Sequence, residues 1–72
     1  MNRLEILGRR LRVLRKEKKQ RQKDMGDFLG MTLRNYQRME NGEINIPTLT
    51  LCTLADYFGV STDYLLGRSE ER

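Results

Sequence analysis

The feature that most constrains how this chain folds is a glycine followed two residues later by a threonine, within the segment 22–41. Gly30 comes directly after the apolar residue Leu29. A glycine past the end of an apolar-periodic run ends a helix, because it accepts a positive φ without a clash at Cβ. Thr32 begins the next helix, because its hydroxyl oxygen can accept a hydrogen bond from a free backbone N–H group. The segment therefore predicts two short helices joined by a turn of about three residues.

Two helices joined by so short a turn form the arrangement known as helix-turn-helix. We expect the first over residues 22–29 and the second over residues 33–41. The large apolar side chains predicted to face inward are Met25, Leu29, Met31, Tyr36 and Met39. Gly26 is predicted to lie where the two helices approach each other, because a larger side chain there would push them apart. Arg21 stands where a capping Ser or Thr is expected, so the helix at 22–29 should begin loosely.

Three further helices are predicted, which makes the chain an all-α, compact five-helix bundle. One precedes the motif, over residues 3–18, and two follow it, over residues 47–58 and 62–66. The helix at 3–18 carries an apolar stripe at helical spacing: Leu4, Leu7, Leu11 and Leu14. We expect residues 1–67 to form one domain, followed by a polar C-terminal tail, residues 68–72, that frays.

Composition excludes several classes of protein. The chain contains one cysteine and no histidine, so neither an intramolecular disulfide nor a zinc site is expected. Cys52 is predicted to be a small buried apolar residue. No run of about 20 apolar residues is present to span a bilayer, and the charged start does not resemble a signal peptide. We therefore expect a soluble, cytoplasmic protein without metal, cofactor or small-molecule substrate, and not an enzyme.

Charge is divided unevenly along the chain. Residues 1–23 carry ten Arg or Lys against two acids, whereas residues 24–72 carry four Arg against eight acids. Such an asymmetry indicates a negatively charged partner on one side of the fold, although a solvated helix face explains it equally well. A membrane surface is another negatively charged partner, but the basic first helix has only modest apolar content.

The helix predicted at 33–41 presents a polar face opposite its apolar one. If Tyr36 marks the buried side, Arg34 and Arg38 fall on the opposite side with Asn41 between them. The flanks are formed by Leu33, Gln37 and Asn35. Arg suits guanine, Asn and Gln suit adenine, and an apolar side chain meets the methyl group of thymine. This chemistry indicates base reading in a DNA groove, although exposed Arg residues alone are common on soluble surfaces.

Two more interactions are predicted around this helix. Gln22 stands in a first helical turn, where free N–H groups and a side-chain amide can hold a phosphate. Glu40 lies about 40° from Tyr36 on the helical wheel, so its carboxylate is near the core and needs a cation. Arg15 borders the buried stripe of the first helix and is the natural partner. We expect these two residues to form a structural ion pair.

In order and spacing, these residues resemble the DNA-binding domain of the lambdoid phage repressors and Cro, the group called HTH Xre-type. The resemblance covers about residues 6–66 and is carried by Leu11, Arg15, Gln22, Met25, Gly26, Gly30, Met31, Glu40-Asn41-Gly42, Leu54-Ala55, Gly59-Val60-Ser61 and Asp63-Tyr64-Leu65-Leu66. It implies a five-helix bundle in which Gln22 and Asn41 hold phosphates and Arg15 pairs with Glu40. It also implies that five residues face the major groove: Leu33, Arg34, Asn35, Gln37 and Arg38.

Five positions depart from this family pattern, beginning with Gln20, where an apolar residue is usual, and Arg21, where a small polar cap is usual. Gly26 replaces the usual Ala, and Tyr36 replaces the usual Ile or Val, so that the tyrosine hydroxyl must find water or a partner. Glu43 places an acid in a connector that is often basic, which disfavours DNA binding by this loop.

Together these features predict a sequence-specific double-stranded DNA-binding transcriptional regulator, namely a repressor that binds a palindromic operator as a homodimer. The residues expected to contact DNA are Gln22, Thr32, Leu33, Arg34, Asn35, Gln37, Arg38 and Asn41. The dimer interface is expected to involve Ile44, Ile46, Tyr64 and Leu66, because a chain this small cannot bury them all. The alternatives are a protein-interaction module, such as an antitoxin or adaptor with the same fold, and a cationic membrane-active peptide.

Overall fold

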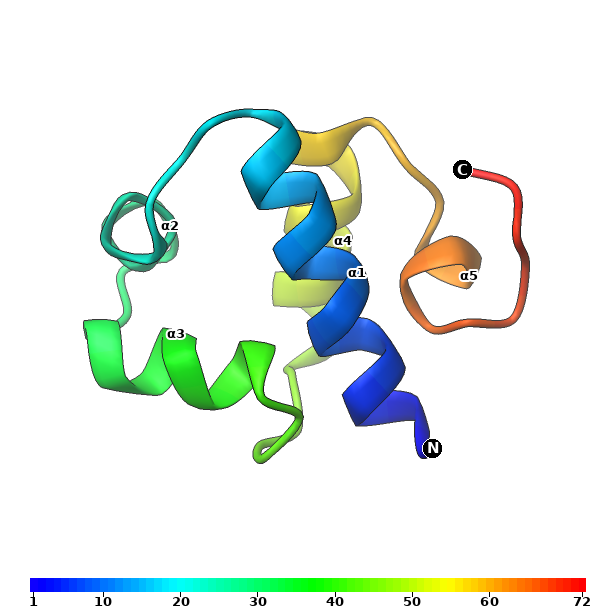
Figure 1. Cartoon of the computed structure of the whole chain (residues 1–72), viewed down its shortest axis with the longest axis horizontal. Helices are drawn as coiled ribbons and strands as arrows, with labels where there is room; N and C mark the ends of the chain where they lie inside the picture. Colours follow the sequence, from blue (N-terminus) through cyan, green and yellow to red (C-terminus); the bar gives the residue numbers. More distant parts are fainter.

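The computed structural model describes residues 1–72 and contains five helices and no strands. The helices are α1 (Arg3–Glu17), α2 (Gln22–Leu29), α3 (Leu33–Glu40), α4 (Thr48–Phe58) and α5 (Thr62–Leu65). Helix α1 runs through the middle of the molecule, with α2 and α3 on one side, α5 on the other and α4 behind (Figure 1). The predicted all-α, five-helix fold is therefore confirmed. None of the helices has the length and apolar composition needed to cross a bilayer.

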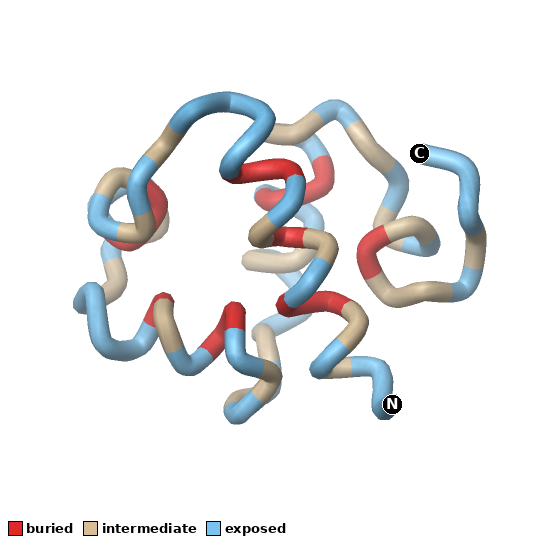
Figure 2. The backbone as a smooth tube through the Cα atoms, viewed as in Figure 1, coloured by how far each residue is buried: buried red, intermediate tan, exposed pale blue.

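A single core is shared by all five helices. Its nine buried residues are Leu7, Leu11, Leu14, Met25, Tyr36, Met39, Leu54, Ala55 and Leu65. The buried stretches of the helices turn toward the centre of the molecule (Figure 2). Leu29 and Met31, which we expected to face inward, are partly buried and pack against this core. The apolar periodicity thus identifies the inward faces of the helices.

The turn between α2 and α3 has the predicted conformation. Gly30 ends α2 with a left-handed backbone, at φ 69°. The Thr32 hydroxyl oxygen accepts a hydrogen bond from the Asn35 N–H (3.1 Å), which caps α3. A Cβ atom on Gly26 would lie 3.2 Å from the Met31 carbonyl oxygen, so α2 approaches the turn closely at this position.

The first turn of α2 is held by more interactions than the sequence predicted. Arg21 provides no side-chain cap, but the Asp24 carboxylate accepts a hydrogen bond from the Arg21 backbone N–H (2.8 Å). The Arg21 guanidinium also pairs with Asp24 (2.9 Å). This pairing, foremost its side-chain hydrogen bonds, lowers the pKa of Asp24. The prediction of a loose start overlooked that the third residue of a helix can close its first turn from inside.

Helices α1 and α3 come into direct backbone contact at Gly8. A Cβ atom on Gly8 would lie 2.7 Å from the Glu40 carbonyl carbon and 3.0 Å from the Met39 carbonyl oxygen. Both groups belong to the backbone of α3, which cannot rotate away as a flexible side chain can. The crossing of α1 and α3 therefore requires glycine at this position.

Two expectations about the C-terminal half are wrong. Cys52 is exposed, because it precedes the buried Leu54 by two residues and so lies on the opposite side of α4. The tail is not frayed but folds back on the bundle. The Ser61 N–H donates to the Arg72 main-chain oxygen (2.7 Å), and the Arg72 guanidinium forms two hydrogen bonds with Glu17 (2.6 and 2.8 Å).

Candidate nucleic-acid interface

One face of α3 is open to solvent. Its exposed residues are Leu33, Arg34, Asn35 and Arg38, with Thr32 before the helix and Asn41 after it. Leu33 keeps 45% of its surface exposed although it is apolar. The guanidinium groups of Arg34 and Arg38 form no ion pair and no hydrogen bond within the chain, so these donors are free for a ligand. This face offers charged, amide and apolar groups to a partner at the same time.

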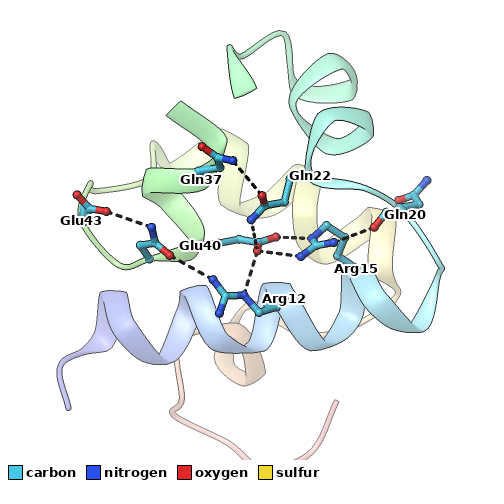
Figure 3. A network of polar contacts seen from close by, with 8 residues as sticks. Arg12, Arg15, Gln20, Gln22, Gln37, Glu40 and Glu43 are labelled. Carbon is cyan, nitrogen blue, oxygen red and sulfur yellow. Dashed lines mark hydrogen bonds and ion pairs between the residues drawn. The ribbon is translucent and has the colours of Figure 1, made fainter. Parts of the chain in front are cut away.

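The opposite face of α3 carries a buried carboxylate that ties three helices together. Glu40 has no exposed side-chain surface, and its Oε2 accepts a 2.6 Å hydrogen bond from Arg15 Nε of α1. Its Oε1 accepts from three donors: Arg15 Nη2 (3.2 Å), Arg12 Nε (3.3 Å) and Gln22 Nε2 (3.1 Å). These contacts surround the carboxylate in Figure 3. The structure thus brings together the two residues expected to pair, Arg15 and Glu40, and adds Arg12 and Gln22.

The carboxylate of Glu40 stays ionised in this position. Burial by itself would raise the pKa of Glu40, but the hydrogen bonds and charge of Arg15 outweigh it and hold the pKa below its usual value. The hydrogen bond to Glu40 in turn raises the pKa of Arg15. Arg15 is satisfied on its remaining side by the Gln20 carbonyl oxygen, which accepts from Nη1 (2.9 Å). The pair is therefore a charged, well-coordinated tie between α1 and α3.

The two glutamines near the open face are joined to this network rather than free. Gln22 donates to Glu40 through its amide nitrogen and accepts from Gln37 Nε2 through its amide oxygen (3.2 Å). Both glutamines are partly buried. Arg12 was not expected here, yet it precedes Arg15 by three residues, which places the two on one side of a helix. That spacing is the signal that would have found it.

Asn41 lies where the network reaches solvent. Its Oδ1 accepts from Arg12 Nη2 (3.2 Å), and its Nδ2 donates to Glu43 Oε2 (3.2 Å). Arg12 keeps 43% of its side chain exposed, so this corner of the molecule is accessible. One chain of contacts thus runs from Gln37 through Gln22, Glu40, Arg12 and Asn41 to Glu43 (Figure 3).

The Tyr36 hydroxyl is buried without a hydrogen-bond partner. Burial and the nearby Glu40 carboxylate raise the pKa of Tyr36, so the group is a neutral phenol. The Glu40 carboxylate is the nearby acceptor, but no hydrogen bond of normal geometry joins it to the Tyr36 hydroxyl.

Replacing Tyr36 with phenylalanine is expected to leave the protein as stable as before, or more stable by about 1 kcal/mol, because it removes an unpaired buried polar group. Urea denaturation of the Tyr36→Phe variant measures this difference. Tyr57→Phe, which alters a partly exposed tyrosine, serves as the control. A clear loss of stability in Tyr36→Phe alone would mean that the hydroxyl is bonded after all.

The four residues expected at a dimer interface are only partly buried, and all pack against the core: Ile44, Ile46, Tyr64 and Leu66. Two guanidinium groups lie over the Tyr64 ring, with the Cζ atoms of Arg10 and Arg72 at 4.2 Å and 5.5 Å from the ring centroid. The most exposed large apolar side chain after the motif is Leu49, with 79% of its surface free. It stands in the first turn of α4, three residues after Ile46, and was missed by the sequence reasoning.

The amino-acid sequence is similar to those of known proteins. A family model described as a helix-turn-helix domain matches residues 6–66. The chain is 41% identical over 61 residues to the SPbeta prophage-derived uncharacterized HTH-type transcriptional regulator YonR of Bacillus subtilis (strain 168), covering 85% of this chain and 56% of that protein. It is 36% identical over 64 residues to the HTH-type transcriptional regulator ImmR of the same organism, covering 89% of this chain and 50% of that protein. The chain thus spans about half the length of these curated relatives.

Proposed function

The chain belongs to the helix-turn-helix domain family, in agreement with the resemblance seen in its sequence, and on this premise we propose that it binds double-stranded DNA sequence-specifically and regulates transcription. The observation that carries the proposal is the open face of α3, where Arg34 and Arg38 are exposed and unpaired. The regulator names of two relatives support the same reading.

In this proposal, α3 lies in the major groove. The free guanidinium groups of Arg34 and Arg38 suit the O6 and N7 atoms of guanine, and the Asn35 amide suits adenine. The exposed Leu33 side chain suits the methyl group of thymine. Gln37 borders the same face, but its amide nitrogen is engaged with Gln22, so base contact by Gln37 requires a change of hydrogen-bond partner.

The network around Glu40 would hold α3 at a fixed angle for this reading. Phosphates would be held beside it by Asn41 and by the first turn of α2, whose backbone N–H groups point outward from the helix start. The amide of Gln22 is used within the protein, so its backbone N–H is the more available donor. The positive charge of α1 would add attraction that does not depend on sequence.

We further propose that the protein acts as a repressor and binds a palindromic operator as a homodimer, because one short helix reads only a few base pairs. The proposed dimer face consists of Ile44, Ile46, Tyr64 and Leu66, and we add the exposed Leu49. Two reading helices related by a twofold axis would meet half-sites about 34–36 Å apart.

Selection of bound sites from random duplexes is expected to return a palindrome with half-sites one helical turn apart. On that site, Arg34→Ala should weaken binding by about 1–3 kcal/mol and relax the preference at one base position, because it removes a base contact. Titration of cognate and random duplexes measures both effects.

Lys23→Ala is the control, since Lys23 is an exposed cation outside the reading face, although it pairs with Asp27 (2.8 Å) where Arg34 is unpaired. It should lower the affinity for cognate and random DNA by similar factors. If Arg34→Ala kept the wild-type ratio of cognate to random affinity, base reading by Arg34 would be wrong. Weak binding with a salt slope near zero would instead favour a protein-interaction module.

A further inference from the structure

We infer that Glu43 is a built-in antagonist of DNA-backbone binding, whose carboxylate stands at the Asn41 amide where a phosphate would bind. The inference rests on the proposed function and concerns the regulation of the same site. It starts from a contact within the free protein: Asn41 Nδ2 donates to Glu43 Oε2 at 3.2 Å.

The orientation of the Asn41 amide is fixed from both sides. Arg12 can only donate, so it holds the amide oxygen (3.2 Å), and the amide nitrogen is turned toward the carboxylate of Glu43. Asn41, Glu43 and part of Arg12 are exposed, so this donor faces solvent. The Asn41 amide nitrogen, at the end of α3 and beside the Arg12 guanidinium, is suited to bind an anion. In the free protein that anion is the Glu43 carboxylate.

The Glu43 carboxylate has no second partner through which it would stabilise the fold. Glu43 forms no ion pair, and its carboxylate has no hydrogen bond other than the one from Asn41. The backbone N–H of Glu43 donates to the Arg38 carbonyl oxygen (2.9 Å), but the carboxylate itself is held only by the Asn41 amide.

A phosphate at Asn41 would meet this charge at short range. A phosphate oxygen bonded to Nδ2 at about 3 Å would lie at most about 6 Å from the Glu43 carboxylate. Two like charges at that separation repel noticeably even in water. DNA binding must therefore displace the Glu43 side chain or tolerate the repulsion, and either lowers affinity for every sequence alike, since the phosphate carries no sequence information.

The test is Glu43→Gln, which removes the charge and keeps an oxygen that can accept from Asn41. We expect this variant to bind duplex DNA of random sequence about threefold to tenfold more tightly than the wild type at low salt. The selected cognate duplex should gain by the same factor, so the ratio of the two affinities stays unchanged. The plot of log K against log salt should steepen by up to about 1.

Glu71→Gln is the matched control, because it makes the same change of net charge at an exposed tail residue that forms no ion pair. If Glu43→Gln bound no more tightly than Glu71→Gln, the inference would be overturned while the proposed function stood. A gain restricted to the cognate duplex would also overturn it, because a phosphate site cannot discriminate sequence. Absence of salt-dependent binding by the wild type and Glu43→Gln together would overturn the proposed function and this inference with it.

Discussion

Replacing Glu40 with alanine is expected to lower the free energy of unfolding by about 3–5 kcal/mol, enough to unfold much of a marginally stable domain of this size. The reason is the charge that the substitution leaves behind. Arg15 has only 10% of its side chain exposed, and without Glu40 its guanidinium is buried with no carboxylate. Arg12 and Gln22 lose the same acceptor. Urea and thermal denaturation followed by circular dichroism measure the loss.

A second variant separates the stranded charge from lost packing. Combining Arg15→Met with Glu40→Leu removes both buried charges and fills the space with apolar atoms, so most of the lost stability should return. Arg12 and Gln22 still lack their acceptor in this variant. Glu71→Ala, which removes an exposed acid, should change stability little. A double variant as unstable as Glu40→Ala alone would show that the charged network itself, and not the unpaired arginine, is what the fold requires.

Gly8→Ala is the other substitution with a large expected effect, a destabilisation of about 3 kcal/mol. The added methyl group would meet the carbonyl carbon of Glu40 at 2.7 Å, and both backbones would have to move apart. The alanine gains only about 1 kcal/mol in helix propensity, which is too little to offset the clash. Because Gly8 meets α3 itself, DNA affinity should fall together with stability. Denaturation and duplex titration of one preparation test both.

Gly26→Ala is the matched comparison within the same fold. Its Cβ would lie 3.2 Å from the Met31 carbonyl oxygen, a distance that a small shift of the turn relieves. The cost should be nearly cancelled by the gain in helix propensity. If Gly8→Ala proved no more harmful than Gly26→Ala, backbone contact between α1 and α3 would not govern their crossing.

The sequence predicted best what depends on local periodicity. The helical wheel separates the buried Tyr36 from the exposed Arg34 and Arg38, because both faces of one helix are encoded within a few turns. The turn at Gly30 was equally easy to predict from the sequence, because a left-handed backbone conformation favours glycine. The same periodicity should have predicted that Cys52 is exposed. Cys52 lies two residues before the buried Leu54, so it falls on the opposite side of α4.

Contacts between distant segments were harder to predict. The need for glycine at position 8 arises only because α3 crosses α1, and the residues next to Gly8 in the sequence do not predict that crossing. The tail offers a similar case, because Arg72 pairs with Glu17, which lies 55 residues away in sequence. The long-range contact of Glu40 was an exception that the sequence did predict. An acid on the apolar face of a helix needs a cation beside it, whichever part of the chain supplies that cation.

The folded tail determines where a group joined after Arg72 leaves the surface of the protein. Because Arg72 is held by Ser61 and Glu17, the C-terminus lies beside α5, while α3 lies across the molecule from it (Figure 1). A fluorophore, an affinity tag or a fused domain joined after Arg72 would therefore begin its path away from the open face of α3. The same chain end can serve as a tether to a solid support in binding measurements, with the reading helix turned toward the solution.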